Sequence, residues 1–459
     1  MNTAPDVVVI GGGAGGLTAA SQAKRMGASV MLVADGPLGG DCTHTGCVPS
    51  KTLIAAAARG DDFATAITTV HATIDRIAAT EGVAHLTHAG IEVARGRARL
   101  TSAGTVDVAG TTVRCKGVII ATGARPSLPP IPGLESVSPL TNESVFDLRS
   151  LPPSLLIIGA GAIGCELAQA FARFGTAVTL LDIADRVLAG EEPEASAVID
   201  AALRRSGVDL QLGVSLESAT VMASGVRTSL ADGTTVDAAF VLVAAGRQAV
   251  TDGLGADTVG LELDQRGRIV VDDTCATNVA GIWAIGDVTQ HGGFTHMAGH
   301  MGYVAARNAT RTRRLIRPTH IDTSVVPRVT YTDPEVASIG MTVAQAADHG
   351  GRVAHLPMDR VDRAITAGRT EGFVKLIAGP RCIIGTAGGG HILGATIVAP
   401  TAGEMIHEPA LAMKTNMFAG RLAQTTHAYP SWSMAIQQAA TQFFYATDGL
   451  EARPAETAP

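Results

Sequence analysis

The sequence predicts an α/β fold with two Rossmann-like units followed by a C-terminal α+β domain. Two stretches, 6–34 and 155–182, each consist of an apolar strand, a glycine-rich turn, a helix and a second strand. From residue 318 onward, strand and helix patterns continue without such a turn. The repeated pattern indicates two parallel-sheet units, and its loss indicates a separate third domain.

The first glycine-rich turn follows directly on the apolar strand 6–10 and opens a helix at 17–26. In this context the pattern G-x-G-x-x-G binds a dinucleotide. Its glycines let the backbone approach a pyrophosphate, and the helix N-terminus stabilises the negative charge. The glycines in this register are Gly11, Gly13 and Gly16.

The acidic residue that would bind a ribose after the next strand is displaced by one position. Ala34 occupies the expected place, and Asp35 comes one residue later. Either Asp35 takes the role from the loop, or the contact with the ribose is weakened.

The second turn repeats the pattern with Gly159, Gly161 and Gly164, and its acidic residue is in place. Asp182 ends the following strand at the spacing expected for a carboxylate on the ribose 2′-hydroxyl. A carboxylate there repels a 2′-phosphate, and the first arginine beyond it, Arg186, follows three residues that are not basic. The sequence therefore favours NADH over NADPH.

A pair of cysteines with four residues between them lies in 38–51, just before a helical run. On a straight helix this spacing puts the two side chains too far apart for an unstrained disulfide. Gly46 and Pro49 flank the second cysteine and distort the backbone there. We interpret Cys42 and Cys47 as a redox-active pair on a turn or strained helix start, with two unpaired thiols as the alternative. Two dinucleotide turns around such a pair suggest a flavin that passes electrons from a nicotinamide to sulfur.

The composition limits the classes of partner that the protein can bind. The chain has 459 residues, of which 46% are hydrophobic and 17% charged, and a net charge of −7. An acidic protein is a poor partner for nucleic acid, because phosphate binding requires a cationic face. The sequence has no basic amphipathic run and no unbroken long apolar stretch, so we expect no membrane partner. The low cysteine content and the absence of a secretory signal predict a cytoplasmic location.

Together the motifs resemble the flavoprotein pyridine nucleotide-disulfide oxidoreductases, the group of lipoamide dehydrogenase, glutathione reductase and mercuric reductase. The resemblance covers nearly the whole chain. Besides the two glycine turns, it rests on the cysteine-containing stretch 39–51, Ala-Thr-Gly at 121–123, Gly286-Asp287 and Tyr-Thr-Asp-Pro-Glu at 331–335.

The resemblance implies an FAD domain, an NAD(P) domain and a dimerisation domain, with each active site of the homodimer shared between two subunits. We expect the FAD domain at 1–150 and 271–317, the NAD(P) domain at 151–270 and the dimerisation domain at 318–459. In the last we expect an antiparallel sheet with helical runs near 402–416 and 431–446 packed on it.

The resemblance also implies roles for individual residues. Cys42 resembles the thiol that exchanges with substrate, and Cys47 the thiol beside the flavin. Lys51 resembles the lysine near the flavin that pairs with a glutamate, here Glu166. A nearby cation and a helix N-terminus would lower the pKa of a thiol and so favour its thiolate form. Further residues expected to bind cofactors are Asp35, Gly40, Lys51, Thr122, Gly123, Asp182, Gly246, Arg247, Gly286 and Asp287. The remaining cysteines, expected to be small buried side chains, are Cys115, Cys165, Cys275 and Cys382.

The C-terminal segment departs from the pattern H-x-H-P-T-x-x-E that supplies a His–Glu pair in this group. Tyr429 occupies the position of the base and Met434 that of the glutamate, while His427 remains two residues earlier. Because the pKa of tyrosine is about 10, Tyr429 is a poor base at neutral pH. Whether His427 and Tyr429 act in chemistry or only in packing is open. In having a tyrosine at this position, the sequence is similar to those of mercuric reductases.

We therefore predict an FAD-dependent enzyme that passes electrons from NAD(P)H through the Cys42–Cys47 disulfide to a small acceptor. The acceptor would be a disulfide, a metal ion or another small molecule, and we expect no resident metal. Two alternatives remain. One is direct transfer from flavin to quinone or oxygen, and the other is a flavin-binding redox sensor without turnover.

Overall fold

The computed structural model describes residues 4–311, 317–380 and 385–457. It divides the chain into two compact units, each assembled from separate stretches. The first holds 1–130, 139–151 and 245–323, and the second holds 131–138, 152–244 and 324–459. The domain boundaries expected at residues 150, 270 and 317 stay predictions.

The first unit is built on a five-stranded parallel sheet in the order β17-β7-β1-β2-β3. Its strands are β1 (Val7–Ile10), β2 (Val30–Ala34), β3 (Glu92–Arg95), β7 (Gly117–Ile120) and β17 (Ile282–Ala284). Every residue of β1 is buried, as expected of a central parallel strand covered on both faces.

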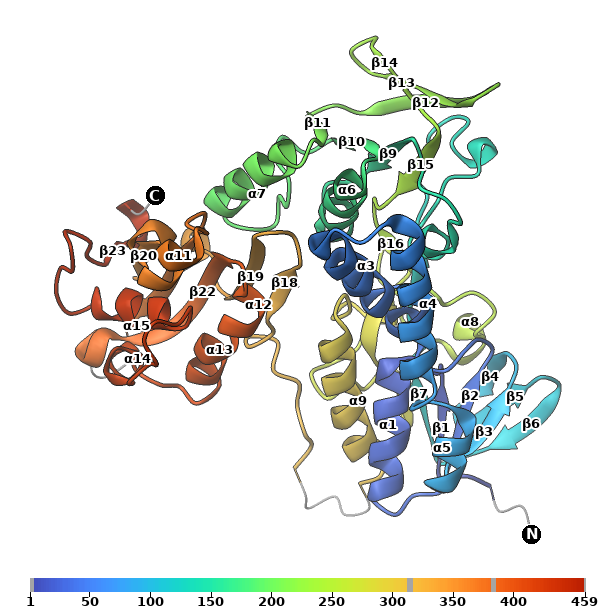
Figure 1. Cartoon of the computed structure of the whole chain (residues 1–459). Helices are drawn as coiled ribbons and strands as arrows, with labels where there is room; N and C mark the ends of the chain where they lie inside the picture. Colours follow the sequence, from blue (N-terminus) through green and yellow to red (C-terminus); the bar gives the residue numbers. More distant parts are fainter. Residues whose placement is uncertain (1–3, 312–316, 381–384, 458–459) are drawn as a thin grey trace. The chain divides into compact units, whose positions relative to one another are not determined.

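Two helices of the first unit, α1 (Ala14–Arg25) and α9 (Thr295–Ala309), lie side by side (Figure 1). They approach closely because glycine lies at the contact. A Cβ added at Gly302 would lie 2.6 Å from the carbonyl oxygen of Gly15. This contact joins the start of the chain to residues nearly 300 positions later, so the unit needs both segments.

Shorter elements complete the first unit. The antiparallel sheet β4-β5-β6 and the pair β8-β16 accompany the main sheet. The strands are β4 (Ala98–Ser102), β5 (Thr105–Val108), β6 (Thr111–Arg114), β8 (Ala124–Pro126) and β16 (Arg247–Ala249). The helices are α2 (Gly40–His44), α3 (Cys47–Arg59), α4 (Phe63–Ala78), α5 (Val83–His88) and α8 (Ala256–Val259).

The second unit begins with a four-stranded parallel sheet in the order β11-β10-β9-β15, with an antiparallel sheet β12-β13-β14 beside it in sequence. Its helices are α6 (Ala162–Phe174) and α7 (Pro193–Arg205). Its strands are β9 (Ser154–Ile158), β10 (Ala177–Asp182), β11 (Asp209–Leu212), β12 (Leu216–Met222), β13 (Gly225–Leu230), β14 (Thr235–Ala238) and β15 (Phe240–Val243). The expected second strand–turn–helix–strand pattern is confirmed.

The C-terminal part of the second unit is an antiparallel sheet in the order β18-β19-β22-β21-β20-β23, which confirms the expected α+β domain. Its strands are β18 (Arg328–Thr330), β19 (Glu335–Gly340), β20 (Arg352–Pro357), β21 (Phe373–Gly379), β22 (His391–Ala399) and β23 (Arg453–Pro454). Its helices are α10 (Val343–Ala347), α11 (Asp362–Ala367), α12 (Ala402–Met405), α13 (His407–Lys414), α14 (Ala419–Gln424) and α15 (Met434–Thr441). Aliphatic residues of β19, β21, β22 and α15 share one buried core.

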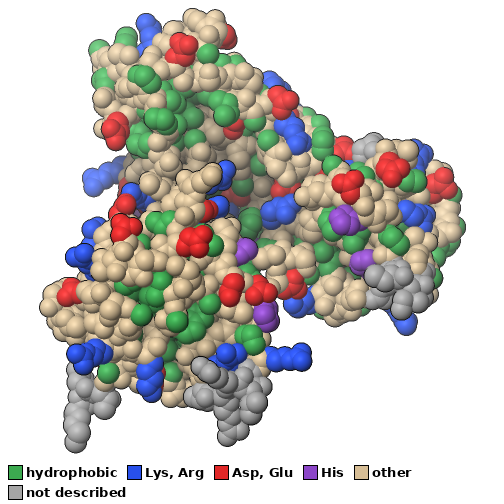
Figure 2. Space-filling view, turned by 180° about the vertical axis from the view of Figure 1, so that it is seen from behind, with side chains coloured by type: hydrophobic (Ala, Val, Ile, Leu, Met, Phe, Trp, Pro, Cys, Tyr) green, Lys and Arg blue, Asp and Glu red, His purple; other side chains and the backbone are tan. Residues whose placement is uncertain are grey.

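The described surface carries charges of both signs. On the face shown in Figure 2, Lys and Arg side chains are interspersed with Asp and Glu side chains. No helix within the described ranges is long and apolar enough to cross a membrane.

Candidate active site

The middle glycine of each fingerprint leaves space for something other than protein. A Cβ added at Gly161 would meet no described atom within 4 Å, and one at Gly13 would meet only the Cα of Gly40, at 3.9 Å. The protein itself therefore does not require glycine at these two positions. Glycine there leaves room for a group that comes close to the backbone, such as a pyrophosphate at a helix N-terminus. Both turns fit a dinucleotide on this ground.

The third glycine of each fingerprint has a different cause. A Cβ at Gly16 would lie 1.9 Å from the carbonyl oxygen of Gly11, and one at Gly164 would lie 1.8 Å from that of Gly159. Here the helix packs directly on the turn, so glycine is required by the fold and not by a ligand.

The two acidic residues after the second strands differ in how they are held. Asp182 accepts hydrogen bonds from the backbone N–H groups of Ala160, at 2.5 Å, and Ala184, at 2.8 Å. It is thereby tied to the second glycine turn. Asp35 follows β2 and makes an exposed ion pair with Arg97 at 3.6 Å. These contacts are all within the protein, and the predicted binding of Asp35 and Asp182 to a ribose stays a prediction.

The two cysteines come together where two helices meet. Cys42 lies in α2, and Cys47 is the first residue of α3, with Gly46 at the N-cap position. Both are free thiols and the two side chains are hydrogen-bonded to each other. The break at Thr45 and Gly46 brings them together, as the sequence predicted for a distorted helix start.

The environment makes the two thiols unequal. The hydrogen bond from Cys42, together with the Thr295 hydroxyl and the positive charge of Lys51, lowers the pKa of Cys47 to about 6. The same hydrogen bond and burial raise the pKa of Cys42. The distance between Cys47 Sγ and Thr295 Oγ1 is 3.6 Å. At neutral pH the geometry therefore favours a Cys47 thiolate that accepts a hydrogen bond from the Cys42 thiol.

An arginine from β16 links the cysteine-containing loop to the Gly286-Asp287 pair that is predicted to bind flavin. A terminal nitrogen of Arg247 lies 2.9 Å from the carboxylate of Asp41 and donates to the carbonyl oxygen of Ala124 at 2.6 Å. Its Nε lies 3.8 Å from the carboxylate of Asp287, which accepts a hydrogen bond from the N–H of Gly293. This Nε is buried without a hydrogen-bond partner among the described residues, an arrangement that suits an additional acceptor from a bound cofactor.

The Ala-Thr-Gly segment is held by the same part of the chain. The hydroxyl of Thr122 donates to the carbonyl oxygen of Val250 at 2.7 Å, and the carbonyl of Gly123 accepts from the N–H of Val250 at 3.0 Å. Gly246 and Arg247 begin this stretch and lie in the first unit, together with Gly286, Asp287 and the cysteines. Gly40 opens α2, and a Cβ there would lie 2.8 Å from the Cα of Gly13. The first unit thus gathers most of the predicted flavin-side residues.

Lys51 and Glu166 belong to different units, so their predicted pairing stays a prediction. Lys51 lies in α3, one turn after Cys47. Glu166 is buried in α6, and its Oε1 accepts a hydrogen bond from the backbone N–H of Tyr331 at 2.8 Å.

The C-terminal residues have partners of their own. The Nε2 of His427 lies 3.1 Å from both carboxylate oxygens of Glu408, and its Nδ1 lies 2.9 Å from the carbonyl oxygen of Thr425. Both ring nitrogens are engaged, which favours a packing role for His427. Tyr429 is exposed and donates to Asp362 at 3.0 Å, a contact that raises its pKa further.

Sequence reasoning missed Thr295, Asp41, Asn142 and Glu408. Asn142 donates to the Asp41 carboxylate at 2.9 Å, and Thr295 contacts Cys47 from the start of α9. No spacing in the sequence signals such distant contacts. Among the other cysteines, Cys165 and Cys275 are buried as expected, Cys115 is only partly buried, and Cys382 lies outside the described residues.

Within the described ranges, no group of three or more His, Cys, Asp and Glu side chains is arranged to hold a metal ion.

The chain matches two protein families. The pyridine nucleotide-disulphide oxidoreductase family matches residues 5–308, and the pyridine nucleotide-disulphide oxidoreductase dimerisation domain matches residues 326–440.

Similar curated proteins and solved structures cover nearly the whole chain. A mercuric reductase of Streptomyces lividans is 35% identical over 96% of this chain and 97% of its own length. A dihydrolipoyl dehydrogenase of Geobacillus stearothermophilus is 35% identical over 95% of each chain. The Cu(II) complex of the HOCl-induced flavoprotein disulfide reductase RclA from Escherichia coli has a TM-score of 0.87 at 28% identity, covering 96% of this chain and 99% of that one. LpdA from Mycobacterium tuberculosis has a TM-score of 0.84 at 29% identity, covering 96% and 100%.

The two kinds of fingerprint glycine should respond differently to alanine. Gly161→Ala should change the free energy of unfolding by less than about 0.5 kcal/mol but weaken NADH binding, because the added methyl group occupies the space left for phosphate. Gly164→Ala should destabilise the protein by about 2 kcal/mol or more, because it overlaps a carbonyl oxygen. Thermal denaturation and calorimetric NADH titration measure both effects. Unimpaired NADH binding by Gly161→Ala would contradict the assignment of the second turn.

The pKa of Cys47 should depend on Cys42. In reduced protein, the rate at which iodoacetamide alkylates Cys47 should rise with pH and reach half its maximum near pH 6. This is the pKa of about 6 that the surroundings give to Cys47. Cys42→Ala should move this midpoint upward, because the thiolate loses a hydrogen-bond donor, and Thr295→Val should move it in the same direction. Mass spectrometry of the alkylated peptide gives the rates. An unchanged or lower midpoint in Cys42→Ala would show that the two thiols are not in contact.

Proposed function

We propose, because this chain belongs to the pyridine nucleotide-disulphide oxidoreductase family, that it passes electrons from NAD(P)H through FAD to the Cys42–Cys47 pair and on to a small acceptor. The chain is an oxidoreductase of the kind that uses FAD and a nicotinamide dinucleotide. The redox role of this particular cysteine pair and the identity of the acceptor are the proposed part.

The observation that carries the proposal is the inequality of two hydrogen-bonded thiols. Cys47 has a lowered pKa and Cys42 a raised one, although they are five residues apart. A pair that only filled space at a helix entrance would not need a hydroxyl, a cation and a helix N-terminus around one sulfur. A thiol whose pKa is shifted beside a glycine turn that could bind a cofactor is typical of a reacting group.

The chemistry that a bound FAD supplies is acceptance of a hydride from NAD(P)H and delivery of two electrons to sulfur. Reduction of a Cys42–Cys47 disulfide breaks its S–S bond and, with two protons, yields two thiols. Cys47 then releases its proton at neutral pH, while Thr295 and Lys51 stabilise the thiolate. Cys42 keeps its proton until it reacts. The residues on the nucleotide side are the two glycine turns, Asp182 and Arg247.

With a disulfide acceptor, Cys42 passes its proton to the hydrogen-bonded Cys47 thiolate. The Cys42 thiolate then attacks one sulfur of the acceptor, the second sulfur leaves as a thiolate, and the proton now on Cys47 goes to the remaining thiol. Cys47 then attacks Cys42, releases the remaining thiol and re-forms the pair. With a metal ion, the same two electrons reduce one mercuric ion or two cupric ions. Both routes leave the protein oxidised and ready for the next hydride.

The C-terminal segment favours acceptors that need little help from a base. Tyr429 has a raised pKa, and both nitrogens of His427 are engaged. A metal ion needs no proton, and a disulfide with an acidic leaving thiol needs none at the departing sulfur. The names of a mercuric reductase and of a Cu(II) complex among the similar proteins point in the same direction.

We further propose NADH as the preferred electron donor. We also propose a homodimer with the active site shared between subunits, because the chain contains the family's dimerisation domain.

Anaerobic titration with NADH or dithionite tests the redox role of the pair. The wild type should take up two electrons more than Cys42→Ser or Cys47→Ser before the flavin is fully bleached, because the S–S bond accepts two electrons. A long-wavelength band from the thiolate beside the flavin should appear only while Cys47 is present. Complete bleaching of the wild type by two electrons would contradict the proposal.

The same variants separate the alternatives in steady state. A screen of disulfides, mercuric and cupric ions and quinones with NADH and NADPH identifies the acceptor. Full quinone or oxygen reduction by the serine variants would favour direct transfer from flavin. Slow turnover with every acceptor would favour a redox sensor.

A further inference from the structure

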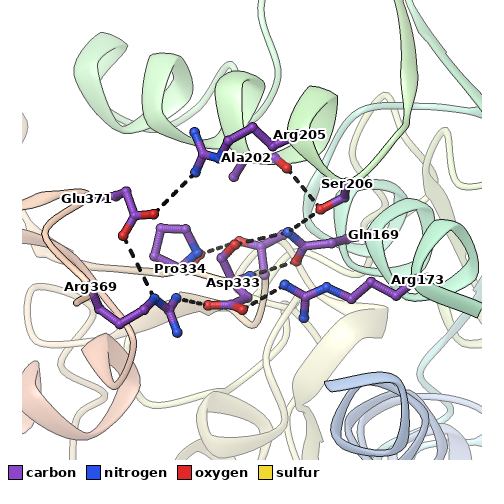
Figure 3. Close-up of polar contacts among 10 residues, drawn as sticks. Gln169, Arg173, Ala202, Arg205, Ser206, Asp333, Pro334, Arg369 and Glu371 are labelled. Carbon is purple, nitrogen blue, oxygen red and sulfur yellow. Dashed lines mark hydrogen bonds and ion pairs between the residues drawn. The ribbon is translucent and has the colours of Figure 1, made fainter. Parts of the chain in front are cut away.

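One face of α6 is fixed to a segment far along the chain. Glu166, Gln169 and Arg173 recur at helical spacing, so they share this face. All three bond to residues 331–333: the first accepts from the N–H of Tyr331 at 2.8 Å. The other two reach Asp333 (Figure 3).

Gln169 bonds to the backbone of Asp333, and Arg173 bonds to its side chain. The amide oxygen of Gln169 accepts from the backbone N–H of Asp333 at 2.7 Å, and its amide nitrogen donates to the backbone carbonyl at 3.0 Å. Arg173 donates to the Asp333 carboxylate at 2.6 Å. Because Gln169 is buried, its two bonds replace hydrogen bonds that water would otherwise supply.

The Asp333 carboxylate is shared between two arginines. Its second oxygen bonds to Arg369, which also lies 3.8 Å from Glu371, and Glu371 in turn lies 3.6 Å from Arg205 in α7 (Figure 3). Burial raises the pKa of Asp333, but the two guanidinium groups outweigh it and the pKa lies below its usual value. A charged Asp333 is therefore the point where contacts from α6 and from the C-terminal sheet domain meet.

The helix so held is the one that begins at the second glycine turn. Its N-cap is Gly161, whose open side suits a pyrophosphate, and it carries Glu166 two residues after Gly164. An α-helix of this length moves as one body, so the bonds of Gln169 and Arg173 help to fix its N-terminus and Glu166, in addition to the packing of Gly164 on the turn and the bond from Tyr331 to Glu166.

We propose that Asp333 is a positioning residue for the nicotinamide dinucleotide: through Gln169 and Arg173 it fixes α6, and thereby the phosphate turn and the Glu166 carboxylate. This rests on the proposed function only in that the second glycine turn binds NAD(P)H. It does not depend on the cysteine pair or on the acceptor.

Two variants with opposite charge changes distinguish positioning from simple electrostatics. NADH is an anion, so a through-space effect would make Asp333→Asn bind it more tightly and Arg173→Met more weakly. Positioning predicts that both weaken binding, by roughly five- to thirtyfold. Gln169→Met, which leaves the charge unchanged, should weaken it in the same direction. Calorimetric titration of FAD-loaded protein with NAD⁺ measures binding without turnover.

Stopped-flow reduction of the flavin by NADH gives the limiting rate and the apparent dissociation constant separately. We expect the dissociation constant to rise and the reduction by dithionite to stay as in the wild type. The matched control is Asp237→Asn, which removes one partner of the exposed Arg227–Asp237 pair, 2.7 Å long, on β13 and β14 of the same unit. It should bind NAD⁺ like the wild type.

Thermal denaturation shows whether each variant is folded, and Gln169→Met keeps the test open if the charge variants are not. Wild-type NAD⁺ binding by folded Asp333→Asn and Gln169→Met, or opposite effects of the two charge variants, would overturn the proposal. Because flavin reduction by NADH does not require the thiols, these outcomes stand apart from a failure of the Cys42–Cys47 mechanism.

Discussion

The contact between the Cys42 and Cys47 thiols is the interaction on which the functional account depends. It exists because α2 ends and α3 begins within the cysteine spacing, with Gly46 at the N-cap of α3. One sulfur thereby gains the N-terminus of a longer helix, and the other becomes its hydrogen-bond donor. The difference in pKa between the two thiols follows from this geometry and not from their sequence.

The first unit places this pair beside the first glycine turn by close backbone contact. A Cβ at Gly40 would lie 2.8 Å from the Cα of Gly13, so a side chain at the start of α2 would push the loop off the turn. Arg247 and Asn142 then hold Asp41 from two other stretches of the chain. Glycine contact sets how near the loop comes, and the charged contacts set its orientation. The second unit uses a comparable division, since Gly164 lets α6 approach its turn and Asp333 holds its other end.

Sequence reasoning reached the features whose causes are local. The strand–turn–helix patterns, the cysteine pair and the α+β character of the C-terminal part depend on residues within about one helix or strand of each other. The contacts of Thr295 with Cys47, of Arg247 with Asp41 and of Glu408 with His427 join distant segments and depend on how the elements pack. For Asp333 the sequence offered only a place in the Tyr-Thr-Asp-Pro-Glu segment. Its partners Gln169 and Arg173 became visible only with α6 in position.

The central claim, that electrons from NADH reach the sulfurs of Cys42 and Cys47, can be read directly from the mass of one tryptic peptide. Residues 26–51 contain both cysteines and no other, and the peptide is bounded by Arg25 and Lys51. In isolated oxidised enzyme this peptide should carry an internal disulfide and resist alkylation. After anaerobic treatment with NADH it should carry two alkyl groups. A peptide that is alkylated equally before and after NADH would contradict the account.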